Sequence, residues 1–250
     1  MPVKKVKYLC IRFKNEVGFQ ELRKFRGAVI EVAGREHSLF HNHEDGNFRY
    51  RYPLIQYKRI GGKAGLLCLE DGVHEVHAFF QGRPKTLRLG DREIVPEVET
   101  MQMKEINLQV WDLPFHYQIQ NWLALSQDNY PVWQNMPDDA ERHRFLSTIL
   151  RGNLLSMAKG LDWFIDREVK VKLNHVGPSQ LTRFKEQSMT AFHVHFSTNI
   201  WLPPYLGLGK GSALGYGMVS PDRQLVNQPQ IKHDEQRDDL PGGATAAKNS

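Results

Sequence analysis

A polar stretch around residue 40 carries the side chains best suited to proton transfer. His37, His41 and His43 lie close together in it, and Tyr50 and Tyr52 follow just downstream. Imidazole can take or give a proton near neutral pH. Because His41 and His43 are two residues apart, an extended loop would bring both to one site. We take them as a general acid and base in unassigned order, with Tyr50 orienting the substrate or donating a second proton. His37 could instead cap the preceding helix.

Two metal-based alternatives exist for the same stretch. The letters His41-Asn42-His43 match the name of the HNH nucleases, but those enzymes need well-separated ligands on a ββα unit, and this is one contiguous tripeptide. Zinc could be held by the imidazoles with Glu44 and Asp45, although no cysteine lies nearby. We expect neither a metal nor another cofactor.

A glycine-rich run at residues 207–217 is the second candidate. Backbone with so little side-chain cover can adopt left-handed conformations and bring its N–H groups close to an anion. It does not end in the Gly-Lys-Ser/Thr of a Walker loop, and it does not fit a dinucleotide fingerprint. We expect it to hold nucleic-acid backbone, with a flexible hairpin tip as the alternative. The residues assigned to this role are Gly207, Gly209, Lys210, Gly211, Gly215 and Gly217.

Positive charge is concentrated near the N-terminus. The chain of 250 residues has a formal net charge of +5, and residues 1–63 hold 14 Lys and Arg against 6 Asp and Glu. Such an excess favours a polyanionic partner, and Lys58 and Arg59 could hold phosphate charge. A solvated basic face is the alternative.

The first half of the chain predicts a ferredoxin-like unit. Residues 5–13 alternate as a buried strand, and residues 18–32 have the spacing of an amphipathic helix. Strands at 48–60 and 64–69, a helix at 72–80 capped by Asp71, and a strand segment at 95–111 follow. The order is strand, helix, strand, strand, helix, strand, which is typical of a split βαβ fold.

A second unit of similar order follows. We predict helices at 117–125 and 139–159, the latter opened by a capping box of Asp138 and Glu141. Strands are expected at 163–173, 189–199 and 216–220. The fold class is therefore α+β, with two tandem ferredoxin-like domains and antiparallel sheets. The predicted domains are residues 1–95 and 96–222, and residues 223–250 are a tail without periodicity.

Bulk properties favour a cytoplasmic protein. No apolar run approaches the roughly 18 residues of a membrane helix, and the basic N-terminus lacks the apolar run of a secretion signal. Cys10 and Cys68 each lie in an apolar stretch, so we expect two reduced, buried thiols, with a disulfide as the alternative.

The glycine run has a specific pattern, in which two Gly-hydrophobic-Gly triplets flank five residues that include Lys210. It resembles the C-terminal signature of the CRISPR-associated repeat-processing endoribonucleases of the RAMP superfamily (Cas family six), in the branch with paired histidines. Residues 52–58, 153–160 and 198–203 support the likeness, which spans roughly residues 3–220.

The resemblance implies two ferredoxin-like (RRM-like) folds and metal-independent cleavage of CRISPR repeat RNA. In that reaction the 2′-hydroxyl attacks the neighbouring phosphate, leaving a 2′,3′-cyclic phosphate or 3′-phosphate and a 5′-hydroxyl. His41 and His43 match the family's acid/base positions by order and spacing.

The resemblance also sets the expected partners. The expected partners are pre-crRNA, other CRISPR interference proteins and a second copy of the chain. No membrane contact is expected. A non-catalytic crRNA-binding subunit is the alternative function. His193 and His195 share one face of a strand that could contact RNA or be an ordinary polar face.

Overall fold

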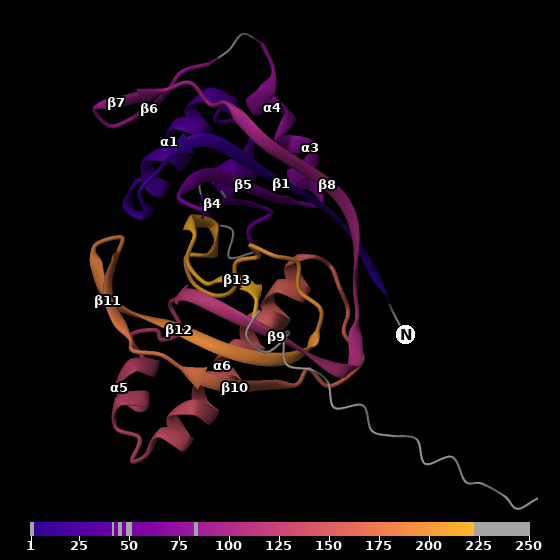
Figure 1. The fold of residues 1–250 in the computed structure, drawn as a ribbon, viewed down its shortest axis with the longest axis vertical. Coiled ribbons are helices and arrows are strands. Elements are labelled where there is room, and N and C mark those ends of the chain that lie inside the picture. The colour runs from indigo at the N-terminus through magenta and orange to yellow at the C-terminus, as the bar shows by residue number, and fades with distance from the viewer. Residues whose placement is uncertain (1–2, 42, 45–46, 49–51, 83–84, 223–250) are drawn as a thin grey trace, which may run out of the picture.

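The computed structural model describes residues 3–41, 43–44, 47–48, 52–82 and 85–222. The predicted tail at 223–250 and Tyr50 lie outside these residues. The chain forms two stacked units, with the N-terminal one uppermost in Figure 1 and the C-terminal one below it. None of the helices in the described ranges is long and apolar enough to cross a membrane.

The N-terminal unit is an antiparallel sheet in the order β4-β5-β1-β8. This is the strand order of a ferredoxin-like fold, as predicted. Helices lie between the first and second strands and between the third and fourth. The main elements are β1 (Lys4–Glu16), α1 (Leu22–Ala33), β4 (Ile55–Ile60), β5 (Lys63–Leu69), α3 (Asp71–Glu75), α4 (His77–Phe80) and β8 (Val98–Leu108). The smaller ones are η1 (Phe19–Glu21), α2 (Ser38–His41), β2 (His43–Glu44), β3 (Asn47–Phe48), β6 (Leu87–Leu89) and β7 (Arg92–Ile94).

Both faces of this sheet are buried. Leu9 and Ile11 of β1 face the helices of their own unit and belong to one hydrophobic core. Val6 and Tyr8 face the opposite way, into a core that is shared with the C-terminal unit. The predicted alternation of β1 is confirmed, and each of its two faces contributes to a different core.

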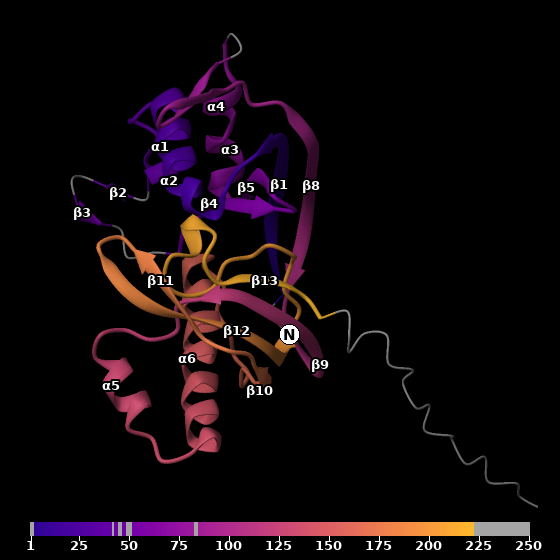
Figure 2. The ribbon, with the colours of Figure 1, turned by 60° about the vertical axis from the view of Figure 1, so that its left-hand side comes forward.

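The C-terminal unit repeats the strand order, as β10-β12-β9-β13, with β11 paired to β12. Its long helix α6 covers one face of the sheet (Figure 2). A second helix would be expected between β12 and β13, but residues 201–217 fill that place with only a 3-10 turn, η2 (Ser212–Leu214). The other elements are β9 (Val110–Trp122), α5 (Asn129–Gln134), α6 (Asp139–Gly160), β10 (Val171–Val176), β11 (Gln180–Phe184), β12 (Gln187–Ile200) and β13 (Met218–Pro221).

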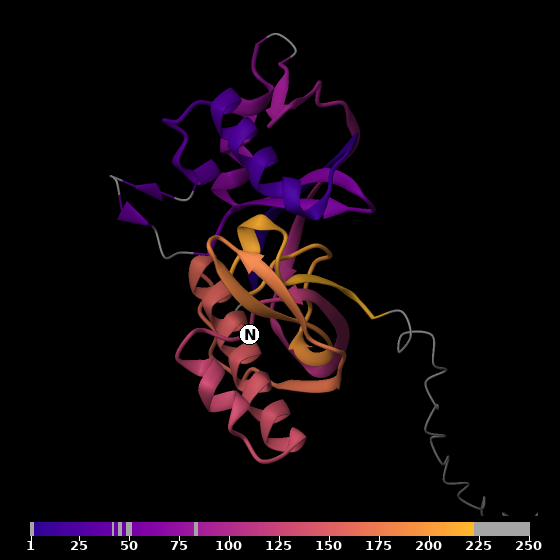
Figure 3. The same cartoon turned by 90° about the vertical axis from the view of Figure 1, so that its left-hand side faces the viewer.

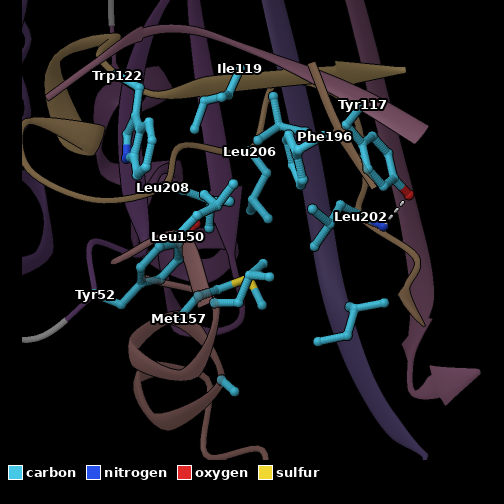
Figure 4. Packing of buried hydrophobic residues seen from close by; sticks show 14 of the residues in the cluster. Tyr52, Tyr117, Ile119, Trp122, Leu150, Met157, Phe196, Leu202, Leu206 and Leu208 are labelled. Carbon is cyan, nitrogen blue, oxygen red and sulfur yellow. Dashed lines mark hydrogen bonds between the residues drawn. The ribbon is translucent and has the colours of Figure 1, made fainter. Parts of the chain in front are cut away.

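The shared core lies between α6, the C-terminal sheet and residues 201–217. Leu150 and Met157 of α6 point toward Leu206 and Leu208 of that segment, and Tyr52 packs beside them (Figure 4). Half of the predicted capping box of α6 is present, because the Asp138 carboxylate accepts from the Glu141 N–H over 2.8 Å. An N-terminal cap and an apolar stripe therefore fix α6 as predicted.

Several predictions were wrong. Residues 117–122 belong to β9, not to a helix. Asp71 is the first residue of α3 and Glu70 is its N-cap, without a side-chain cap. The segment at 95–111 contains two strands, and β8 pairs with β1, so the boundary between the units falls at Gln109 rather than at residue 95.

The two cysteines are free and buried, as expected for reduced thiols. They belong to different cores, Cys10 to the shared core and Cys68 to the core beneath the helices. Burial raises the pKa of the Cys10 thiol above its ordinary value. Both side chains act as small apolar core groups.

Candidate nucleic-acid interface

A groove of about 460 Å³ lies at the boundary between the two units. Its walls come from the start of α1, the turn between β11 and β12, and the glycine-rich segment. In Figure 3 the orange β11–β12 hairpin rises beside the yellow segment toward the N-terminal unit. The lining residues are Phe19, Gln20, Leu22, Arg23, Arg26, Arg183, Phe184, Lys185, Glu186, Leu214 and Tyr216.

The groove has a net positive lining. Arg23, Arg26, Arg183 and Lys185 line it, and Glu186 is the one carboxylate among the lining residues. Glu186 forms an ion pair of 2.9 Å with Arg183. Cations gathered over a concave surface attract polyanions.

Three aromatic side chains, Phe19, Phe184 and Tyr216, also line the groove. Tyr216 makes edge-on contacts with Phe19, at 4.9 Å between ring centroids, and with Phe184, at 5.3 Å. The Lys210 ammonium lies 5.9 Å from the Phe184 ring centroid. Positive charge over aromatic rings is the composition of surfaces that bind single-stranded nucleic acid.

Tyr216 also contacts the β11–β12 hairpin. Phe184 pairs with Gln187, so Lys185 and Glu186 form a two-residue turn, and Lys185 has a left-handed φ of 56°. The Tyr216 hydroxyl donates to the Arg183 carbonyl oxygen over 3.2 Å. The glycine-rich segment therefore supports the hairpin that carries Arg183 and Lys185.

The short helix α2, which ends at His41, is held by side chains from three other elements. The Glu75 carboxylate accepts from the Leu39 N–H over 2.9 Å. The buried Tyr57 hydroxyl donates to the Phe40 carbonyl oxygen over 3.0 Å. The Arg26 guanidinium donates to the His41 carbonyl oxygen over 2.5 Å. Three consecutive residues are thus fixed through their backbone.

Arg26 connects this helix to the groove. It lines the groove and also holds the backbone of His41. Burial lowers the pKa of its guanidinium from the ordinary value. A charged group that is partly withdrawn from water interacts more strongly with an incoming phosphate.

The histidines themselves are placed unequally. His41 is half-buried, and its Nε2 lies 2.8 Å from the Arg35 carbonyl oxygen. Because a carbonyl can only accept, Nε2 carries the proton in this arrangement. His43 follows in β2, whose backbone pairs with Phe48 in a separate two-stranded ribbon.

The glycine-rich segment is packed rather than open. Gly209, Gly211, Gly215 and Gly217 have positive φ, as the sequence led us to expect of a left-handed loop. A Cβ on Gly217 would lie 2.0 Å from the Leu208 carbonyl oxygen. Most of the segment is buried, and Lys210 is its exposed residue. These glycines allow close packing between the units, and the Gly217 N–H is already bonded to the Asn121 carbonyl oxygen over 3.2 Å.

Two glycines contact the N-terminal unit directly. The Gly207 N–H donates to the Gln56 side-chain oxygen over 3.0 Å, and its carbonyl oxygen accepts from the Tyr52 hydroxyl over 2.8 Å. A Cβ on Gly215 would lie 2.6 Å from Leu22 of α1. The segment therefore joins the two units.

Lys58 has a different role from the one expected. It is 0% exposed, and its ammonium group donates to the Ser212 carbonyl oxygen over 3.0 Å. Burial lowers its pKa from 10.5 to about 7. A side chain enclosed between the units cannot contact RNA phosphate, so that expectation is corrected. Arg59 is exposed but lies outside the groove lining and donates to the Val17 carbonyl oxygen over 2.8 Å.

The groove cations were missed in the sequence. Lys185 lies in a turn without glycine or asparagine, and Arg183 lies two residues before it, so no hairpin signal marks them. In the sequence, Arg23 and Arg26 contribute only to the net charge of residues 1–63. The signal that could have found them is Arg183-Phe184-Lys185, a basic and aromatic triplet between two strand-like runs.

Comparison with known proteins gives consistent matches over both units. The profile of the Cas6b N-terminal domain matches residues 4–107, and that of the Cas6b C-terminal domain matches residues 109–221. The one residue between the two matches is Leu108, the last residue of β8.

Solved structures match the whole fold. A crystal structure of Cas6b has a TM-score of 0.80 and 28% identity, covering 88% of this chain and 100% of that one. A crystal structure of a CRISPR RNA processing endoribonuclease Cas6b has a TM-score of 0.67 at 24% identity, with the same coverage. An uncharacterised protein of Methanocaldococcus jannaschii is 32% identical over 101 residues, covering 40% of this chain and 67% of that protein.

Proposed function

This chain belongs to the Cas6b family, and on that premise we propose that it is a metal-independent endoribonuclease that processes CRISPR repeat RNA. The observation that carries the proposal is the basic groove, joined through Arg26 to the helix that ends at His41. A groove with arginines and aromatic rings suits RNA, and the attached histidine segment supplies groups for proton transfer.

The proposed reaction uses the nucleophile within the RNA. One imidazole of the His41–His43 pair removes the proton of the 2′-hydroxyl, and O2′ attacks the adjacent phosphorus. The other imidazole protonates the departing 5′ oxygen. The bond from phosphorus to O5′ breaks, leaving a 2′,3′-cyclic phosphate and a 5′-hydroxyl. Tyr50 orients the ribose or donates a second proton.

The groove supplies binding and charge compensation. Arg23, Arg183 and Lys185 are exposed cations that would hold the phosphates on either side of the cut. Arg26 would offset charge that develops on the attacked phosphate. Since the Nε2 of His41 is engaged with Arg35, His43 is the better candidate for direct contact with the reacting atoms.

The test is cleavage of a CRISPR repeat RNA in excess EDTA, followed by analysis of the product ends. We expect a cyclic phosphate, a 5′-hydroxyl, and no cut when the nucleotide before the scissile phosphate is 2′-deoxy. His43→Ala should abolish cleavage while RNA is still bound. His77→Ala is the matched control, because His77 is an exposed histidine on α4.

Three results would overturn the proposal. Loss of cleavage in EDTA that returns with a divalent metal would indicate a metal-dependent nuclease. Cleavage of the 2′-deoxy substrate would exclude attack by the 2′-hydroxyl. Tight binding of repeat RNA by the unaltered protein without any cleavage would identify a crRNA-binding subunit instead.

A further inference from the structure

The C-terminal sheet has a second face that the groove does not use. Helix α6 and residues 201–217 cover one face, where Phe192, Val194 and Phe196 of β12 are buried. The alternate residues of β12, His193, His195 and Ser197, are only half-buried and point the other way. We call this the open face.

Strand pairing arranges the open face as two polar rows. One row runs His175, His195, Gln118 and Ser220 across β10, β12, β9 and β13. The next runs Lys172, Ser197 and His116, followed by Asp222, whose N–H donates to the His116 carbonyl oxygen over 3.0 Å. All eight positions are polar, and three of them are histidines.

One imidazole on this face is held by a buried acid. The Asp222 carboxylate is 2% exposed and lies 2.6 Å from Nδ1 of His195, whose side chain is 29% exposed. Because a carboxylate accepts, Nδ1 carries the proton and Nε2 of the neutral ring is left as an acceptor. Within the described ranges Nε2 has no hydrogen-bond partner. In the neutral state of His195, the pair presents an oriented acceptor on the open face.

A cleft of about 550 Å³ adjoins the second row at the β10 end. Lys170, Lys172, Ser197 and the indole of Trp111 line it, and Trp111 is 38% exposed. Over the residues that the structure describes, neither lysine has a carboxylate within 4 Å. The carboxylates in the lining are Asp112, which is paired with Arg167, and Glu168. Pockets of this volume accommodate small organic ligands.

We propose that the cleft and the adjoining open face form a binding site for single-stranded ribonucleotides, separate from the basic groove. A base stacks on Trp111, and Lys170 and Lys172 bind its phosphate. His195 lies two residues from Ser197, about 6.6 Å along the strand. Its Nε2 accepts from the ribose 2′-hydroxyl, which distinguishes RNA from DNA. Asp222 is a positioning residue that sets the tautomer and orientation of His195.

The test uses the full chain and an unstructured adenine pentaribonucleotide carrying one 4-thiouridine, cross-linked by light and mapped by mass spectrometry. We expect cross-links at Trp111 and in residues 172–175, in addition to any at residues 183–185. Trp111→Ala should remove the cross-links at residue 111 and in residues 172–175 and leave those at residues 183–185. A 5′-phosphorylated mononucleotide is added as a competitor. It should remove the cross-links if the cleft captures a terminal phosphate, and leave them if the cleft recognises an internal phosphodiester.

Binding measurements give an independent readout. These measurements use an Arg183→Ala/Lys185→Ala background, in which RNA binding by the groove is weakened. There, Lys170→Ala/Lys172→Ala should reduce the salt slope, the dependence of log affinity for the pentamer on log salt, by about 1.4. The reason is that each phosphate contact on a single strand contributes about 0.7 to this slope. The matched control is Lys5→Ala/Lys14→Ala, two exposed lysines of β1. Asp222→Asn should lower the preference for the ribo- over the deoxypentamer without changing the salt slope.

Two outcomes of these RNA measurements overturn the proposal. One is cross-linking confined to residues 183–185 and α1. The other is an unchanged salt slope in Lys170→Ala/Lys172→Ala together with an unchanged ribo preference in Asp222→Asn. Neither outcome bears on cleavage of repeat RNA, because the histidines of the proposed reaction are left intact. If the lysine variant instead loses a co-purifying protein and binds RNA normally, the cleft is a protein-docking surface and the proposal fails.

Discussion

The ammonium group of Lys58 donates to the Ser212 carbonyl oxygen over 3.0 Å, inside the boundary between the two units. Strand β4 belongs to the N-terminal sheet, and Ser212 begins the short turn that stands where the C-terminal unit lacks a helix. A buried cation thus joins the two ferredoxin-like units through a backbone carbonyl. The contact between the units therefore includes a group whose pKa is lowered to about 7 by burial.

The first prediction concerns this lysine. Its pKa is about 7 in the folded protein and 10.5 in the unfolded chain, so between these values the unfolded state binds more protons. The free energy of unfolding should therefore rise with pH over this window, by up to about 1.4 kcal/mol per pH unit from this group. Lys58→Met should remove that component, as measured by urea unfolding from pH 6.5 to 9.5. Parallel pH profiles for the two proteins would contradict it.

The second prediction concerns the glycines of the segment. Gly217 has a φ of 60° and no room for a Cβ. Gly217→Ala should lower the free energy of unfolding by more than about 2 kcal/mol, because strain and a backbone clash combine. The control is Gly152→Ala in α6, where a Cβ would meet nothing within 4 Å. That change should stabilise by about 0.5–1 kcal/mol. Equal effects at both positions would show that the segment is not tightly packed.

The third prediction tests the anchoring of α2. Tyr57→Phe leaves the Phe40 carbonyl oxygen without its buried donor. A misplaced histidine segment should slow single-turnover cleavage of repeat RNA about tenfold, with RNA affinity nearly unchanged. Tyr117→Phe is the matched control, since its hydroxyl accepts from the Leu202 N–H in the C-terminal unit. That variant should lose similar stability and cleave at the normal rate. Equal rate losses in both would assign the effect to general destabilisation.

The fourth prediction concerns the groove. Arg183→Ala and Lys185→Ala should each weaken binding of repeat RNA and reduce the dependence of log affinity on log salt by about 0.7 to 0.9. Arg88→Ala is the control, because Arg88 is an exposed arginine of β6 that lines neither groove nor cleft. Unchanged slopes in the first two variants would move the RNA site elsewhere.

Much of the fold could be predicted because alternation and helical spacing are strong where cores are well formed. Strand β1 has a distinct apolar set on each face, and α6 has both a cap and an apolar stripe. The prediction of a helix at 117–125 was wrong, because the spacing of Trp122, Leu123 and Leu125 resembles the apolar stripe of a helix. In the structure the cross-strand pairs with β12 outweigh that local pattern.

The buried state of Lys58 could not be predicted from β4 alone. In the sequence Gln56 and Lys58 alternate with Ile55 and Tyr57, which is the usual pattern of a strand with one wet face. The wet face is covered here by a segment some 150 residues later in the chain. Only the tertiary structure shows that the side chains of Gln56 and Lys58 form hydrogen bonds between the two units.

The candidate site was predicted in part for a similar reason. His41 and His43 were chosen from residue type and spacing, and these assignments stay predictions. The basic groove depends on α1 and the β11–β12 hairpin, which are far apart in sequence and meet only across the boundary. Residue types suggested the chemistry, whereas the surface that would bind RNA arises from the packing of the two units.

The glycine-rich segment also constrains the order in which the protein can be completed during synthesis. Tyr8, near the N-terminus, donates its hydroxyl proton to the Pro204 carbonyl oxygen, and Phe19 packs against Tyr216. These partners leave the ribosome after almost the entire folded part of the chain. The shared face of the N-terminal sheet therefore stays uncovered until residues 201–217 have been synthesised, after more than three quarters of the chain.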